Sequence, residues 1–200
     1  MKRTLLALML AVGFTLSAAC LSTTGAAMAA PTVTELTFCE SWDFESGYYT
    51  VATPDGQSNY GALYWSANFY DTLVQYDDGE FVPGLAESWE VSDDGTVYTF
   101  KLREGVKFSD GADFTSEAVK KSFEAAPVNL GQYNGSYGTL TTLFKEIICP
   151  DDHTVELHLT QPYYGTLKDL TMTVPMGIVN PAMLAEDYTP SDAFRTGTYG

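Results

Sequence analysis

The residues with the greatest potential for chemistry are the two histidines and the carboxylates beside them. His153 follows Asp151 and Asp152, an order that could supply metal ligands, and His158 lies five residues further on. Adjacent aspartates also favour turns, because their side chains hydrogen-bond to backbone groups two residues on. Turn chemistry therefore explains the cluster better than a metal site. We expect both histidines to be exposed, one in a turn and the other on the polar side of a strand.

Short motifs that mark common catalytic sites are absent from the sequence. It contains no Gly-x-Ser-x-Gly turn, no His-Glu-x-x-His helix, no phosphate-binding loop and no dinucleotide-binding glycine fingerprint. Many carboxylates stand in Asp-Asp turns, which turn chemistry explains better than an acid–base pair does. We therefore predict a protein without catalytic residues, a metal site or a cofactor.

The charge balance restricts the partners of the protein. The chain has 26 acidic and 10 basic residues, which gives a formal net charge of −16. Nucleic acids and anionic membranes are bound through basic patches, so neither is an expected partner.

Residues 1–29 are predicted to form a secretory signal peptide. Lys2 and Arg3 precede an apolar run at residues 5–16, and small residues crowd the segment 17–30. The apolar run is shorter than the roughly 20 residues that a membrane-spanning helix needs. Export is therefore expected, to the periplasm or the extracellular space.

Two processing sites compete in this segment. Cleavage after Ala29 would release a free protein that begins at Ala30, and this is the favoured route. Ser17-Ala18-Ala19-Cys20 resembles a lipobox, in which Cys20 would be acylated and would anchor the protein to a membrane.

Local signals predict two β-hairpins with a helix between them. Asp-Gly supplies the positive φ angles of a hairpin turn, and β-branched and aromatic residues flank it. Thr115 is a good residue for the helix N-cap, and Pro127 is expected to end the helix. The predicted strands are 88–91 with 96–102, joined by the turn 92–95, and 146–149 with 154–159, joined by the turn 150–152.

Weaker signals predict the other elements. They are a first strand at 34–38, a long loop at 40–59, a helix at 63–74 that ends in a turn at 76–79, a tight turn at 109–111, a loop at 131–142 with a weak helix near 140–144, a helix at 163–170, a short strand at 175–181 and a helix at 182–186.

One long string of the chain consists of the pieces Leu85-Ala86-Glu87-Ser88-Trp89, Asp93-Asp94-Gly95, Tyr98-Thr99-Phe100, Leu102-Arg103, Gly105-Val106, Phe108, Asp110-Gly111 and Phe114, followed by a V..S pair in the next helix. A second string, D..TV.L.L..P, matches residues 151–162. The first string resembles the hallmark segment of the bacterial extracellular solute-binding proteins, family 5, which serve peptide- and nickel-type ABC importers, and the second resembles another string of that family.

The resemblance implies an α+β or α/β fold, a two-lobed periplasmic binding protein of type II. It implies that this chain holds part of the first lobe and a hairpin-and-helix subdomain appended to it, because family members continue well past the position that corresponds to Gly200. The implied division is a first strand and cleft loop at 30–59, the appended subdomain at 60–165, and a return segment to the larger lobe at 166–200.

The resemblance also implies a receptor that captures an oligopeptide-like solute and delivers it to an ABC permease and ATPase complex. The candidate ligand contacts are Ser41, Trp42 and Asp43, in the loop after the first strand, and Met176 and Gly177, in the return segment. Nickel-type members often place an arginine at the position that best matches Gly177, where it holds the carboxylates of a metal chelate. Glycine at this position favours a peptide.

Alternatives stay open at this point. The protein could be a receptor for a nickel chelate or another small solute, or one lobe of a secreted hydrolase or adhesin. The membrane would be contacted only through the permease or through a lipid on Cys20. An oxidising compartment would also permit a disulfide between Cys39 and Cys149, whose proximity the sequence does not reveal.

Overall fold

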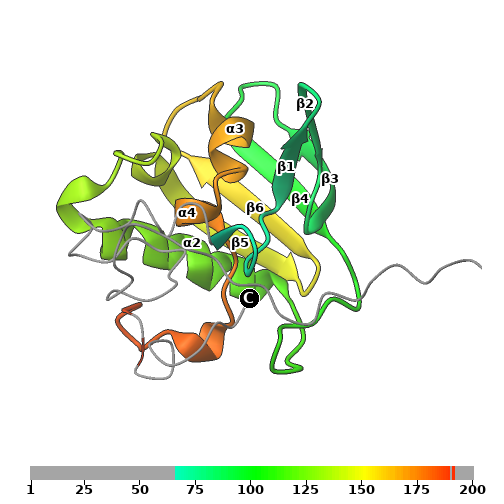
Figure 1. Ribbon diagram of the computed structural model, residues 1–200. Helices are drawn as coiled ribbons and strands as arrows, with labels where there is room; N and C mark the ends of the chain where they lie inside the picture. Colours follow the sequence, from blue (N-terminus) through cyan, green and yellow to red (C-terminus); the bar gives the residue numbers. More distant parts are fainter. Residues whose placement is uncertain (1–65, 190, 192–200) are drawn as a thin grey trace, which may run out of the picture. The chain divides into compact units, whose positions relative to one another are not determined.

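A four-stranded antiparallel sheet with one long helix packed against it forms the centre of the described part of the chain (Figure 1). The computed structural model describes residues 66–189 and 191. The order across the sheet is β3-β4-β6-β5, so the two hairpins meet along their inner strands. The strands are β3 (Ala86–Val91), β4 (Val97–Leu102), β5 (Phe144–Asp151) and β6 (Thr154–Leu159).

Smaller elements surround this centre. A second, two-stranded sheet pairs β1 with β2, and short helices follow β6. Their bounds are β1 (Val74–Asp77), β2 (Glu80–Pro83), α2 (Ser116–Leu130), α3 (Thr166–Leu170) and α4 (Thr173–Met176), with 3-10 turns η1 (Gly131–Tyr133), η2 (Leu140–Thr142) and η3 (Pro181–Met183).

Turn chemistry holds both predicted hairpins, which are confirmed. Asp94 accepts hydrogen bonds from the Ser92 hydroxyl at 2.6 Å and from the backbone and side chain of Thr96 at 3.1 and 2.8 Å. The bond from Ser92 is the main reason that the pKa of Asp94 lies below its usual value. Asp151 does the same between β5 and β6, because its carboxylate accepts from His153 N at 2.9 Å and from the Thr154 hydroxyl at 2.9 Å.

The core lies between α2 and one face of the sheet. Alternate residues of β4 and β6 are buried, as the period of a half-buried strand requires. The rings of Phe123 on α2 and Phe144 on β5 stack with centroids 5.8 Å apart. The buried residues that face one another are Tyr98, Phe100, Leu102, Val155, Leu157 and Leu159 from the strands and Val119, Phe123 and Ala126 from the helix.

Both histidines are half-buried, so the expectation that they are exposed is wrong. His158 lies on the inner strand β6, opposite Val97 of β4 and Glu146 of β5, and its Nε2 is 3.1 Å from Glu156 Oε2. His153 is drawn against β4, because its carbonyl accepts a hydrogen bond from Leu102 N at 2.8 Å.

Helix α2 begins where the sequence predicts but ends later. Thr115 is the N-cap residue, with extended backbone angles and no side-chain capping bond. Pro127 lies inside the helix, which runs on to Leu130, so the prediction that Pro127 ends it is wrong. Burial explains the difference, because Leu130 is 1% exposed and Asn129 2% exposed, and their packing offsets the hydrogen bond that proline removes.

Near the first described residues, the predicted helix at 63–74 does not reach its expected end, because residues 70–73 are irregular and a strand begins at Val74. Val74 begins β1, although residues 63–74 were expected to be helical throughout. Asp78 and Gly79 have φ angles of 45° and 92°, which suit a two-residue hairpin turn, and β1 pairs with β2 around them. The predicted turn at 76–79 is thus confirmed only at Asp78-Gly79, since Tyr76 and Asp77 belong to β1, and it joins two strands rather than ending a helix.

The segment after β6 also differs from the prediction. Helix α3 begins at Thr166 rather than residue 163, and η3 replaces the helix expected at 182–186. Where a strand was expected at 175–181, α4 ends at Met176 with a cis bond before Pro175, and an extended stretch follows. Its Ile178 N donates to Asp71 O at 3.0 Å, so backbone contacts outside a sheet hold it.

Other expectations fall outside the described residues. These are the signal peptide, the first strand at 34–38, and the long loop at 40–59. The proposed domain boundaries at residues 60 and 165 stay predictions.

The first testable consequence concerns Gly138 in the loop between η1 and η2. Its φ is +107°, and a Cβ there would lie 2.7 Å from Asp169 Cγ, a carboxylate that is 7% exposed and accepts from Leu140 N at 3.0 Å. We expect Gly138→Ala to lower the free energy of unfolding by about 3 kcal/mol, from backbone strain and the displaced carboxylate together.

Gly79→Ala is the matched control for urea denaturation of the two variants. Gly79 has a φ of +92°, yet nothing lies within 4 Å of its added Cβ, so the loss should be about 1 kcal/mol. Equal losses in the two variants would show that the contact with Asp169 contributes nothing.

Candidate functional site

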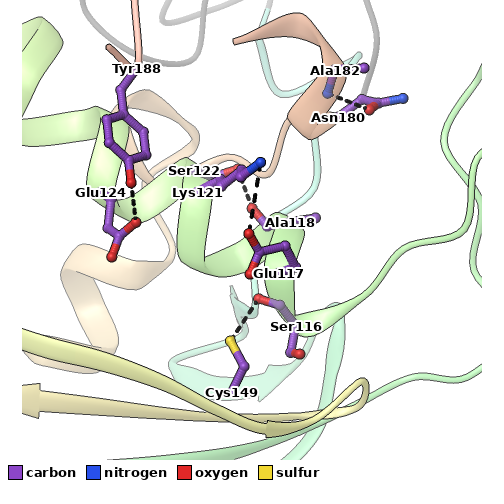
Figure 2. A network of polar contacts seen from close by, with 10 residues as sticks. All are labelled: Ser116, Glu117, Ala118, Lys121, Ser122, Glu124, Cys149, Asn180, Ala182 and Tyr188. Atoms are coloured by element: carbon purple, nitrogen blue, oxygen red, sulfur yellow. Dashed lines mark hydrogen bonds and ion pairs between the residues drawn. The ribbon is translucent and has the colours of Figure 1, made fainter. Parts of the chain in front are cut away.

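The candidate site is the stretch Met176–Asn180, which is the last residue of α4 and the extended residues after it, together with the residues that hold it beside α2. It contains both candidate ligand contacts that the structure describes. The stretch begins at the last residue of α4 and leads into η3, and both α4 and η3 contact α2. Figure 2 shows this side of α2 with Ser122 and Glu124 on the helix and Asn180 and Tyr188 on the neighbouring segment.

Ser122 attaches the stretch to the middle of α2. Its side chain is fully buried, accepts a hydrogen bond from Val179 N at 3.0 Å, and donates one to Ala118 O at 2.7 Å. Both roles of the hydroxyl are therefore used within the protein, and one of them satisfies a buried backbone N–H.

Asp110 attaches the next residue from outside the helix. Its Oδ2 accepts a hydrogen bond from Asn180 Nδ2 at 2.7 Å, and its Oδ1 accepts from Ala112 N at 2.9 Å within the Asp110-Gly111 turn. Asn180 is 3% exposed, and its Oδ1 accepts from Ala182 N at 2.9 Å to cap η3. The predicted turn at 109–111 is thus linked to the Asn180-Pro181 step.

Two contacts further along α2 hold the chain beyond η3. The Tyr188 hydroxyl donates to Glu124 Oε2 at 2.8 Å, and this bond is the main reason that the pKa of Tyr188 is raised (Figure 2). Asn129 Nδ2 donates to Tyr188 O at 2.8 Å. Tyr188 has a φ of 66°, unusual for a residue with a side chain, and the two contacts fix it from both ends.

The start of α2 is tied to the second hairpin. Ser116 N donates to Asp152 O at 2.8 Å, and the Ser116 hydroxyl donates to Asp151 O at 2.7 Å. On the other side, the Cys149 thiol donates to Ser116 O at 3.3 Å (Figure 2). The Asp-Asp-His turn therefore positions a helix with its carbonyl groups, which gives the turn a structural role.

The two described candidate contact residues differ in exposure and in the groups that they could offer to a ligand. The Met176 side chain is 1% exposed and belongs to the main core cluster, so it supplies packing rather than accessible surface. Gly177 has extended backbone angles and donates from its N–H to Thr173 O at 2.8 Å. Ser41, Trp42, Asp43 and the alternative lipidation residue Cys20 lie outside the described residues.

Sequence reasoning missed Asp110 and Ser122 as residues of this site. Both stand in the long string that marked the family resemblance, where Asp110-Gly111 was interpreted as a turn and the V..S pair as part of a helix. The string itself was the available signal, but their partners lie 70 and 57 residues away along the chain.

A separate polar hollow lies at the end of β6 where the second hairpin turns. Its volume is about 840 Å³, and it is lined by the acidic residues Glu87, Glu104 and Asp152 together with Lys101 and His153. Neither Met176 nor Gly177 is among its lining residues.

Two other kinds of site are absent across residues 66–189 and 191. No group of three or more histidine, cysteine or acidic side chains there could hold a metal ion, and no helix is long and apolar enough to cross a membrane.

Comparison with known proteins decides the family. The profile of the bacterial extracellular solute-binding proteins, family 5 (middle part), matches residues 80–200, which is more than half of the chain. The chain belongs to this family. The match includes α2, the Asp110-Gly111 turn and the stretch Met176–Asn180, so the bonds of Ser122 and Asp110 to this stretch lie inside the matched part.

Individual relatives agree with this result. The dipeptide-binding protein of Escherichia coli strain K12 is 39% identical over 124 residues, which are 54% of this chain and 23% of that protein. The structure of NikA from Brucella suis in complex with Fe(III)-EDTA matches with a TM-score of 0.65 and 29% identity, over 76% of this chain and 29% of that one. DppA from Helicobacter pylori in complex with the peptide STSA matches with a TM-score of 0.54 and 30% identity, over 68% and 29%.

These relatives confirm the predicted fold class, part of a two-lobed periplasmic binding protein of mixed sheet and helix. This family 5 chain spans 23–29% of the length of the three proteins named. The family members are binding proteins rather than enzymes.

The state of Cys149 gives the second testable consequence. Within the described residues this cysteine is free, and burial raises the pKa of its thiol. We expect iodoacetamide at pH 8 to label Cys149 more slowly in the folded family 5 protein than in concentrated urea, because less thiolate is present in the fold.

Peptide mapping of the alkylated protein measures this rate at Cys149 alone, and Cys149→Ser identifies the labelled peptide. Labelling that appears only after reduction would contradict the free thiol and support the disulfide with Cys39.

Proposed function

We propose that this protein is the extracytoplasmic solute-binding component of an ABC importer and that it captures oligopeptide-like solutes. The observation that carries the proposal is the family match over residues 80–200. The names of relatives add to it, since a dipeptide-binding protein and a structure with a bound peptide both match this chain.

In this proposal the described residues support one wall of a ligand site rather than forming the whole of it. The stretch Met176–Asn180 returns from the appended subdomain, and Gly177 would approach the solute with its main chain. Ser41, Trp42 and Asp43 would contribute from the loop after the first strand, with Trp42 as an aromatic wall. Closure of two lobes around the solute would present the loaded protein to the permease and ATPase.

A second candidate, a receptor for a metal chelate, also has support. Among the structures named here, the NikA complex with Fe(III)-EDTA has the higher TM-score, 0.65 against 0.54 for the peptide complex. Against it stands Gly177, which offers no guanidinium group to pair with the carboxylates of a chelator. We therefore favour the peptide.

A ligand panel tests the proposal. The full-length gene product should show a raised melting temperature with trialanine and no change with Fe(III)-EDTA or a nickel–histidine complex. A ligand at 100 times its dissociation constant stabilises the folded state by about 2.7 kcal/mol, which is readily measured by thermal shift.

Free alanine and metal-free EDTA are the controls. A shift with the chelates alone would favour the second candidate, and hydrolysis of trialanine would favour a secreted enzyme. A response to none of these ligands would count against a receptor for either class.

The location of the protein is part of the same proposal. We expect export by the predicted signal peptide and a mature N-terminus at Ala30, because Ala27-Met28-Ala29 has the small-x-small pattern of a cleavage site. Intact-mass analysis of the exported protein measures this directly. An acylated species that begins at Cys20 would instead place the protein on a membrane through a lipid anchor.

A further inference from the structure

The polar contacts around Met176–Asn180 have an arrangement that packing alone does not require. Two consecutive residues, Val179 and Asn180, are bonded to two different elements, the helix α2 and the Asp110-Gly111 turn. The stretch donates these two bonds from different groups: the backbone N–H of Val179 donates to Ser122, and the side-chain amide of Asn180 donates to Asp110. Such a pair of bonds fixes both the position of the stretch and its rotation about its own axis.

Of the two hydrogen bonds, the one from Asn180 to Asp110 is of the stronger kind. Its acceptor is a carboxylate, its length is 2.7 Å, and its donor is 3% exposed. Hydrogen bonds with one charged partner contribute more than neutral ones. Asp110 itself is exposed, but its loss would leave the Asn180 amide unsatisfied where water has little access.

Asp110 and Asn180 also have secondary roles that can be separated from their mutual bond. Asp110 uses Oδ1 for Ala112 N and Oδ2 for Asn180, while Asn180 uses Oδ1 for Ala182 N and Nδ2 for Asp110. Each side chain thus keeps one oxygen for its own turn and directs its other group at the partner.

We propose that Asp110 and Ser122 are positioning residues for ligand binding, which hold Met176–Asn180 in the place from which Gly177 meets the solute. The proposal rests on the proposed function, because it assigns the stretch a ligand. Neither residue would touch the solute itself, since Ser122 is fully buried and both carboxylate oxygens of Asp110 are bonded within the protein.

A charge swap isolates the bond between Asp110 and Asn180. Asp110→Asn keeps an oxygen for Ala112 N but turns an amide toward the amide of Asn180, and Asn180→Asp keeps an oxygen for Ala182 N but places two carboxylates together. The double variant D110N/N180D restores one donor and one acceptor in reversed order and keeps both turn bonds.

Trialanine affinity of the full-length protein is the first readout, by calorimetry. We expect each single variant to bind about tenfold more weakly, which equals about 1.4 kcal/mol, and the double variant to recover most of this loss. Ser122→Ala should also weaken binding, because it leaves Val179 N without its acceptor. Wild-type affinity in both single variants, or no recovery in the double variant, would overturn the proposal.

Asp94→Ala serves as the matched control. It removes three hydrogen bonds from the hairpin turn between β3 and β4, all of them within residues 92–96 and none of them made by the stretch. It should lower the melting temperature and leave affinity unchanged. An equal loss of affinity in this variant would show that general destabilisation, rather than positioning, explains the effect.

Hydrogen exchange of the ligand-free protein is the second readout and separates the two proposals. Amides of residues 177–180 should exchange about tenfold faster in each single variant and regain protection in the double variant, while those of β6 stay unchanged. If no peptide binds, the proposed function fails, and these amides still decide whether the pair holds the stretch. Unchanged exchange in the single variants would contradict the positioning role.

Discussion

The packing of α2 on the four-stranded sheet is the contact on which the other described elements depend. Phe123 is fully buried under the helix and stacks on Phe144, and burial of such a side chain contributes roughly 1.5–3 kcal/mol. With its apolar side fixed on the sheet, α2 offers its polar residues Ser122, Glu124 and Asn129 to the segment that follows α4. One helix therefore packs against the apolar core on one side and holds the segment after α4 by hydrogen bonds on the other.

The elements that could be predicted from sequence are those with local determinants. Asp94-Gly95 and the Asp151 turn satisfy their own hydrogen bonds within a few residues, so both hairpins follow from the sequence. The end of α2 does not, because the burial of Leu130 outweighs the local signal of Pro127. The first hairpin was missed for a related reason, since the composition of residues 63–74 suits a helix and only pairing with β2 makes residues 74–77 a strand.

The candidate site was harder to predict than the fold. Val179 and Ser122 are 57 residues apart, and Asn180 and Asp110 are 70 residues apart, so no periodicity or spacing connects them. The family string contained Asp110 and the V..S pair without revealing their use. For Met176 the family resemblance was misleading in another way. It suggested a ligand contact, but the Met176 side chain is buried in the core.

The register of the sheet has a consequence for behaviour at high concentration. The inner pair β4–β6 runs without a shift, whereas the pairing of each edge strand is irregular, between Ala86 and Ser88 in β3 and at two places in β5. Bulges twist an edge strand away from the flat geometry that a foreign strand needs for pairing, and Glu87, Glu90, Lys145 and Glu146 add charge there. Both edge strands of the sheet, as the described residues form it, thus carry protection against edge-to-edge aggregation.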